Sequence, residues 1–139
     1  FAQTIFEFSV VAPSESIVYF PITIHLLFHK RIKDIFFAFS QGVYETTIIL
    51  SDSEHHDVDI LFKNEKIIQE SIGLSSLTIK LPSENSDVSG IYYFILKKLA
   101  WEGINILDII STMHEFTIIV NDENIDRAFS ILKNINKSI

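Results

Sequence analysis

The 139-residue sequence has no cysteine and only four glycines and three prolines. Without cysteine the chain can have no disulfide framework, no thiolate zinc site and no thiol nucleophile, which argues against redox chemistry. Four scattered glycines form no phosphate-binding glycine-rich loop, and no G-x-S-x-G motif is present. The lack of cysteine is consistent with a cytoplasmic protein, and the missing motifs predict neither an enzyme active site nor a cofactor.

Basic residues are also scarce. Eleven lysines and arginines and 18 aspartates and glutamates give 11 − 18 = −7. Nucleic acids and anionic membrane surfaces attract basic proteins, so we expect neither as a partner. The apolar runs are too short for a helical membrane span, and the start lacks the features of a signal peptide. Phe1 in place of Met indicates that some N-terminal sequence is missing.

Apolar residues, by contrast, are abundant. They make up 47% of the chain and include 12 phenylalanines, more than a typical globular surface requires. An extensive buried interface with a second copy would account for this excess, so we expect a homodimer. The length fits one domain of ordinary size or two very small ones.

Residues 89–103 have the pattern of a helix. Ser89 is a suitable N-cap, Gly90 and Ile91 open the helix, and Gly103 is placed to end it in a left-handed conformation. Apolar residues recur at steps of three and four and form one stripe: Ile91, Phe94, Ile95 and Leu99. We expect this stripe to pack on a sheet.

Strand patterns flank this helix. Residues 104–111 and 116–120 are rich in isoleucine and threonine and are joined by the polar turn 112–115, which predicts an antiparallel pair. Upstream, apolar residues at 77, 79 and 81 alternate with polar ones. Asn121 or Asp122 then caps a helix with one apolar face: Ile125, Ala128, Phe129 and Leu132. The predicted order is β-α-β-β-α.

This order of elements and the sequence of its central segments resemble a known family. The segment GIYYFILKKLAWEGINILDIIS, followed by EFTIIV and a capped helix, is similar to an ACT domain, the small amino-acid-sensing module of βαββαβ order. Within the family it most resembles the paired ACT units at the C-terminal end of aspartokinases. Nothing in this sequence matches the kinase domain with which aspartokinases begin. The resemblance therefore implies regulatory sequence without the catalytic part.

An internal repeat predicts two such units. YETTIILSD at 44–52 aligns with HEFTIIVND at 114–122, at a spacing of 70, and Pro13-Ser14-Glu15 aligns with Pro82-Ser83-Glu84 at 69. We predict an α+β fold of two ferredoxin-like βαββαβ units with antiparallel sheets and helices on one face, at residues 1–73 and 74–139. The predicted elements of the first unit are strands at 5–11, 35–40, 45–50 and 67–71 and helices within 18–33 and 57–64. The fourth strand of the second unit is truncated or supplied by another segment.

Two histidine patterns were considered as metal sites. His25 and His29 are four residues apart on a predicted helix, but no carboxylate completes the set. His55, His56, Asp57 and Asp59 lie close in sequence, but adjacent residues face different ways on a helix. A solvated helix start explains that segment, so we expect no metal.

The resemblance implies an effector site where the first strand leads into the helix. A helix N-terminus suits a carboxylate such as that of a free amino acid. Carried over by position, the implied ligand-binding residues are Asn85, Asp87, Ser89, Gly90, Ile91, Ile110, Ser111, Thr112 and Glu115. The first copy offers Ser14, Glu15, Ser16, Ser40, Gln41 and Glu45. The turn STMHE is one residue longer than the turn common in aspartokinases, and the first copy has no glycine opening its helix.

These observations leave two functions open. The resemblance implies an amino-acid-binding regulatory module that senses a small amino acid at a unit interface and transmits it allosterically. The alternative is a structural dimerisation module that binds no small molecule. Tyr92, Tyr93 and Trp101 are assigned to core or dimer packing, because an acidic chain does not favour stacking on nucleic-acid bases.

Overall fold

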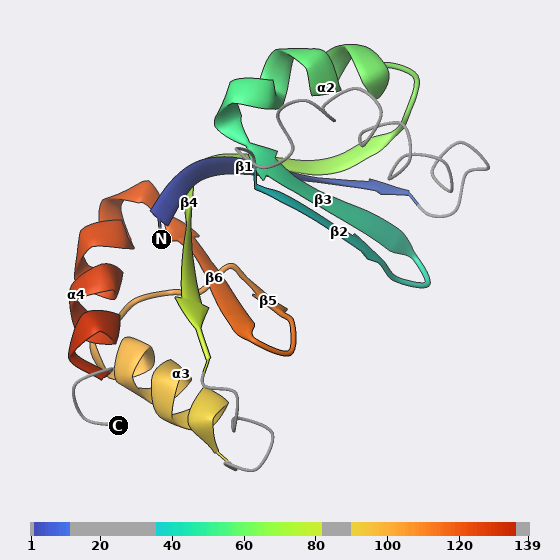
Figure 1. Cartoon of the computed structure of the whole chain (residues 1–139). Helices are drawn as coiled ribbons and strands as arrows, with labels where there is room; N and C mark the ends of the chain where they lie inside the picture. Colours follow the sequence, from blue (N-terminus) through green and yellow to red (C-terminus); the bar gives the residue numbers. More distant parts are fainter. Residues whose placement is uncertain (1, 12–35, 82–89, 136–139) are drawn as a thin grey trace. The chain divides into compact units, whose positions relative to one another are not determined.

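The computed structural model describes residues 2–11, 36–81 and 90–135 (Figure 1). The chain divides into two compact units, an N-terminal unit of residues 4–73 and a C-terminal unit of residues 74–139 with residues 1–3. Both combine antiparallel strands with helices, so the predicted α+β fold class is confirmed. Among the described helices, none has the length and apolar character needed to cross a membrane.

The N-terminal unit is built on antiparallel strands around β3. Strand β3 (Glu45–Ser51) pairs with β1 (Ala2–Val11) on one side and β2 (Phe37–Gln41) on the other. A single 3-10 turn, Asp52–Glu54, then leads into helix α2 (His55–Leu61). The buried apolar side chains of this unit come from both strands and helix: Ile5, Ile48, Ile49, Leu50, Val58 and Phe62.

The C-terminal unit also has a central strand flanked by two antiparallel strands, and its last helix has 11 residues against seven in α2. Its central strand β6 (Glu115–Asn121) pairs antiparallel with β4 (Ile67–Lys80) and with β5 (Asp108–Ser111). Helix α3 (Ile91–Trp101) lies between β4 and β5 in sequence. Helix α4 (Ile125–Ile135) follows β6 after the 3-10 turn Asp122–Asn124.

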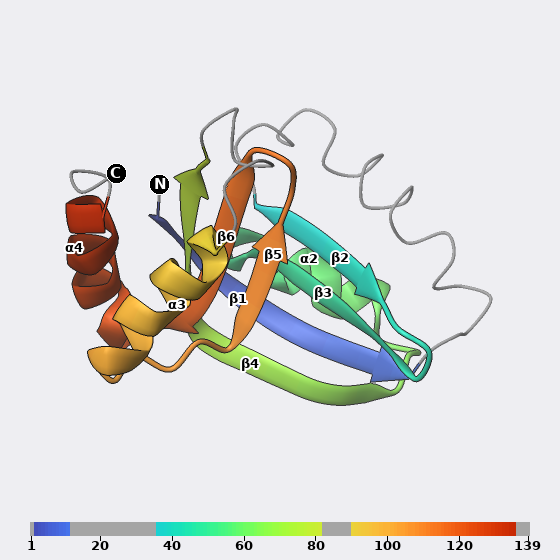
Figure 2. The ribbon, with the colours of Figure 1, turned by 90° about the horizontal axis from the view of Figure 1, so that it is seen from below.

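Helices α3 and α4 both pack on one face of the β4-β6-β5 arrangement, as Figure 2 shows. Alternate residues of β4 and β6 meet the buried positions of both helices there. This core is almost entirely aliphatic: Leu77, Leu81, Ile95, Leu99, Ile104, Phe116, Ile118, Val120, Ala128, Leu132 and Ile135.

The hairpins of the two units have the same register at a spacing of 70. Phe39 pairs with Ile48 in the first hairpin, and Ile109 pairs with Ile118 in the second. Each hairpin closes through the same backbone bond. The Gly42 N–H donates to the Glu45 carbonyl at 2.8 Å, and the Thr112 N–H donates to the Glu115 carbonyl at 2.9 Å.

A cross-strand hydroxyl pair also recurs at equivalent positions. Ser9 Oγ lies 3.0 Å from Thr47 Oγ1 across β1 and β3, and Thr78 Oγ1 lies 2.8 Å from Thr117 Oγ1 across β4 and β6. The central-strand partners are 70 residues apart, and the first-strand partners are 69 apart, as in the sequence repeat. The repeat thus extends from the sequence to strand register and to individual hydrogen bonds.

Several predicted boundaries were wrong. The two strands predicted at 67–71 and 77–81 are one continuous strand, β4, in which Gly73 has a φ of +68°. Strand β5 begins at Asp108 rather than at residue 104, because the Gly103 and Ile104 amides bond to the Ala100 and Leu99 carbonyls and so complete the end of α3. Helix α2 begins at His55, two residues before its predicted start.

Two capping predictions and two packing predictions also change. Gly90 occupies the N-cap position of α3 with a φ of +86°, and the predicted cap, Ser89, lies outside the described residues. Neither Asn121 nor Asp122 caps through its side chain; Asp122 instead accepts a hydrogen bond from Ser75 Oγ at 2.6 Å. Phe94 and Phe129, predicted in the apolar stripes, are substantially exposed.

Some predicted elements cannot be compared with the structure. The helix expected within 18–33, the histidine pair at 25 and 29, and the fourth strand expected near residue 139 all lie outside the described residues.

Candidate functional site

The start of α3 is the first part of the predicted effector site. Gly90 is held at a φ of +86°, in the left-handed region that favours glycine, and no side chain makes a capping hydrogen bond there. A Cβ at this position would meet no atom within 4 Å, so conformation rather than space favours glycine. The first-turn amides of a helix have no intrahelical acceptor, and they point towards the space where an anion can bind.

A hydrogen bond joins this helix start to the end of β5. The Tyr92 hydroxyl lies 3.0 Å from Ser111 Oγ, and both side chains are solvent-exposed. The Tyr92 ring also packs against Phe116, with the ring centroids 5.0 Å apart. The first turn of α3 and the end of β5 are therefore neighbours, as the resemblance implies. Tyr92 was not among the predicted site residues, because the sequence analysis assigned it to core or dimer packing.

The turn between β5 and β6 forms the second part of the predicted site. The Glu115 N–H donates to Thr112 Oγ1 at 3.2 Å, and Ser111 Oγ has the Thr112 and Glu115 carbonyls within 3.3 and 3.5 Å. Ile110 is partly buried, whereas Ser111, Thr112 and Glu115 are exposed. This network fixes the turn and leaves hydroxyl and carboxylate groups facing solvent.

The predicted residues that the structure describes lie at two places. Gly90 and Ile91 lie at the start of α3. The others lie from the end of β5 through the turn to the start of β6: Ile110, Ser111, Thr112 and Glu115. Asn85, Asp87 and Ser89 lie outside the described residues. In the N-terminal unit, Ser40, Gln41 and Glu45 are exposed on the equivalent hairpin, and Ser14, Glu15 and Ser16 are outside the described residues.

Glu115 also contributes to an open cavity of about 510 Å³ in the C-terminal unit. Its walls come from β4, the start of β6 and α4, and they combine apolar with charged side chains: Leu77, Lys80, Glu115, Phe129, Leu132 and Lys133. The side chain of Phe129 is 47% exposed at this cavity. An amphipathic ligand could be held there, but no sequence pattern identified this site.

The second histidine pattern, at residues 55–59, is only partly the solvated helix start that was predicted. His56 and Asp57 are exposed, as predicted for a solvated helix start. His55, however, contacts two carboxylates, Asp59 on the same helix and Glu70 on β4. The sequence indicated the first of these contacts only through the spacing of four residues.

One family model matches part of the chain. The model of the ACT domain matches residues 71–134. This part of the chain matches the ACT domain. The matched residues run from within β4 through α3, β5 and β6 into α4. They include the start of α3 and the β5–β6 turn. No curated protein matches the sequence.

Solved aspartokinase structures share the fold. The ligand-free regulatory subunit of aspartate kinase from Thermus thermophilus has a TM-score of 0.69 at 12% identity, over 96% of this chain and 93% of that chain. A structure of aspartokinase α and β subunits gives 0.69 at 13%, over 96% and 94%. Aspartate kinase from Clostridium acetobutylicum gives 0.72 at 15%, over 96% of this chain but 33% of that chain. At these identities the likeness shows the fold alone.

Proposed function

We propose that this chain is a regulatory amino-acid-binding module, with two ACT units at residues 1–73 and 74–139, and that it has no catalytic role of its own. The match of residues 71–134 to the ACT domain supports this, because ACT domains commonly bind amino-acid effectors. The recurrence of hairpin register and of the hydroxyl pair supports treating the N-terminal unit as a second ACT unit.

The observation that carries the proposal is the hydrogen bond between Tyr92 and Ser111. It joins the first turn of α3 to the end of β5. We expect an amino acid to bind where it can reach both the first-turn amides and the Ser111 hydroxyl. The amides suit the carboxylate of an amino acid, and an acidic side chain such as Asp87 or Glu115 suits its ammonium group. The predicted ligand residues remain Asn85, Asp87, Ser89, Gly90, Ile91, Ile110, Ser111, Thr112 and Glu115.

Two solved relatives indicate what such a module would regulate. The Thermus thermophilus relative is described as a regulatory subunit of aspartate kinase, and the Clostridium acetobutylicum enzyme as an allosteric enzyme. Allosteric output requires that the amino acid bind two arrangements of the protein with different affinity. The proposed partners are a small amino acid and a second copy of the chain.

A thermal-shift screen against the twenty amino acids tests the proposal. Stabilisation follows RT ln(1 + [L]/Kd), so a ligand at about 100 times its Kd adds roughly 2.7 kcal/mol. We expect one amino acid, or a few of similar shape, to raise the melting temperature by several degrees. Ser111→Ala and Tyr92→Phe should weaken that response.

Tyr44→Phe is a matched control, because Tyr44 is an exposed tyrosine beside the equivalent hairpin of the N-terminal unit. The proposal fails if no amino acid shifts the melting temperature. The proposed location of the site is wrong if Ser111→Ala and Tyr92→Phe show the same thermal shift as the wild type while Phe129→Ala, in the open cavity, shows a smaller one.

A ligand-free dimerisation module is the second candidate, and the outer face of α3 favours it. Tyr93 and Trp101 are 67% and 82% exposed. The Lys97 ammonium lies 5.6 and 5.5 Å from the centroids of these two rings. Aromatic residues are enriched at the centres of protein interfaces, where they supply large contact areas.

Light scattering after size-exclusion chromatography tests this candidate. Trp101→Glu and Tyr93→Glu should convert a dimer to a monomer if the outer face of α3 forms the interface. Tyr44→Glu, on the N-terminal unit, is the matched control, because it adds the same single negative charge at an exposed aromatic residue. A dimer that survives both aromatic substitutions removes this face as the interface.

A further inference from the structure

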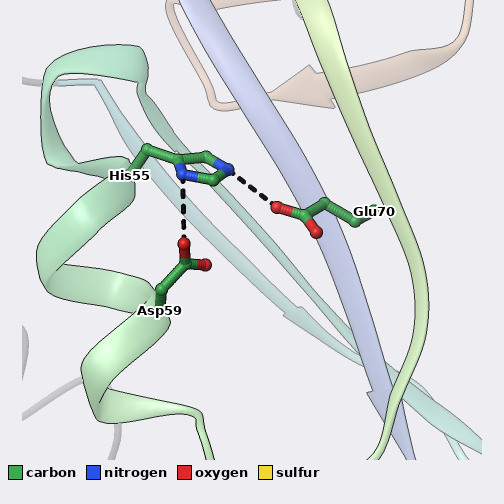
Figure 3. Close-up of polar contacts among 3 residues, drawn as sticks. All are labelled: His55, Asp59 and Glu70. Atoms are coloured by element: carbon green, nitrogen blue, oxygen red, sulfur yellow. Dashed lines mark hydrogen bonds and ion pairs between the residues drawn. The ribbon is translucent and has the colours of Figure 1, made fainter.

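Three side chains of the N-terminal unit converge at one point on its surface, as Figure 3 shows. His55 Nδ1 lies 3.3 Å from Asp59 Oδ2, and His55 Nε2 lies 2.7 Å from Glu70 Oε1. One possible ligand atom from each residue lies within 4.8 Å of the other two. The imidazole therefore stands between two carboxylates from different elements, α2 and β4.

The local structure explains this convergence. His55 and Asp59 are four residues apart on α2, so their side chains share one face of the helix. Glu70 comes from β4, fifteen residues after His55, and its carboxylate points towards the imidazole. The three side chains are 34%, 53% and 39% exposed, respectively. They are thus open to ions in solution.

We propose that His55, Asp59 and Glu70 bind a first-row divalent cation, with Zn²⁺ as the best fit. One imidazole nitrogen and two carboxylate oxygens are ligands that zinc accepts, and water would complete a four-coordinate site. Zinc holds such ligands at about 2.0–2.2 Å, so donor atoms within 4.8 Å of one another can close on the ion through movements of about 1 Å.

The charges of the cluster support a cation. The two carboxylates carry a formal charge of −2 when ionised, and a divalent ion would balance that charge. The nitrogen that binds the ion must be without a proton, so binding releases any proton that it carries.

The repeat shows that the cluster is not a general requirement of the fold. The residues 70 positions after His55 and Asp59 are Ile125 and Phe129 on α4. Both helix positions are apolar in the C-terminal unit, so polar side chains are not needed at these two positions to build the helix. A specific role for the N-terminal unit accounts for the difference.

Calorimetric titration of the whole chain with Zn²⁺ tests this proposal. We expect one ion per chain, and a Kd raised at least tenfold in His55→Ala and in Glu70→Gln. Glu70→Gln keeps the size and shape of the side chain, so it guards against a simple loss of folding. His56→Ala and Asp57→Asn are matched controls on the same helix, and both should bind Zn²⁺ like the wild type.

His25→Ala/His29→Ala tests the other histidine pair in the sequence and should also bind like the wild type. The proposal is overturned if Zn²⁺ does not bind, or if binding is unchanged in both His55→Ala and Glu70→Gln. It is also overturned if His56→Ala or the His25/His29 variant lowers the affinity as much as His55→Ala does. Binding of Mg²⁺ as tight as that of Zn²⁺ would contradict the role of the imidazole, because Mg²⁺ favours oxygen ligands.

Discussion

The two units build the same hairpin but fill equivalent positions with different chemistry. Position 46 in the N-terminal unit holds a fully buried threonine, whereas the equivalent position 116 holds Phe116, part of the C-terminal core. His55 and Asp59 likewise correspond to Ile125 and Phe129. Strand register is therefore retained while side chains diverge, because register depends on the backbone and on alternation rather than on particular residues.

The largest expected effect is a loss of stability on shortening a buried isoleucine in either central strand. It tests whether the two strands contribute equally to the free energy of unfolding. Ile48 and Ile118 are 70 residues apart and both are fully buried. Ile48→Ala and Ile118→Ala should each lower the free energy of unfolding by about 2–5 kcal/mol, because each leaves a cavity. Chemical denaturation measures this change. Ile109→Ala, on the exposed edge strand β5, is the control, and a small loss in either central-strand variant would contradict the equivalence.

Asp52 and Asp122 begin the 3-10 turns of the two units, and we expect them to contribute differently to the free energy of unfolding. Asp122 accepts a hydrogen bond from Ser75 Oγ at 2.6 Å, and a bond to a charged group is stronger than one between neutral groups. Asp122→Ala and Ser75→Ala should each cost about 1–2 kcal/mol of the free energy of unfolding. Asp52→Ala, at the equivalent turn, is the matched control and should cost less. Equal losses in Asp52→Ala and Asp122→Ala would show that the Ser75 bond contributes nothing.

The recurring hydroxyl pair should contribute in both units. Thr117→Val removes the hydroxyl that contacts Thr78, and Thr47→Val removes the hydroxyl that contacts Ser9. We expect losses of about 1 kcal/mol, with the larger loss for Thr117, which is more buried than Thr47. A double-mutant cycle with Thr78→Val measures the coupling, and no coupling would contradict a stabilising pair.

The smallest expected effect is a gain. Thr46 is 0% exposed, and its Oγ1 atom has no hydrogen-bond partner in the part of the chain that the structure describes. Thr46→Val replaces this hydroxyl with a methyl group of similar size, so it should raise the free energy of unfolding by about 1 kcal/mol. Thermal or chemical denaturation measures the gain. A loss of stability would show that the threonine hydroxyl is satisfied in solution.

The sequence predicted what depends on local pattern. Alternating apolar residues located β2, β3 and β6 to within about two residues, and Gly103 has the predicted left-handed conformation, at a φ of +70°. The spacing of 70 anticipated the shared hairpin register. These features depend on residues close in sequence, or on a repeat that the sequence itself contains.

Features that depend on distant residues were not predicted. The contact of Tyr92 with Ser111 and that of His55 with Glu70 join different elements, and neither spacing is a helical or strand period. The exposure of Phe129 likewise depends on what lies beside α4 rather than on the helix pattern. In the candidate site, sequence resemblance identified the helix start and the turn, but it did not identify the tyrosine that joins them.

The exposed ring of Trp101 makes the chain its own optical reporter. Trp101 is the only tryptophan in the sequence, so intrinsic indole fluorescence comes from one known place at the end of α3. With the ring in water and Lys97 above it, emission should lie near that of free tryptophan. A partner that covers this face would shift the emission to shorter wavelength, and an event confined to the N-terminal unit would leave it unchanged.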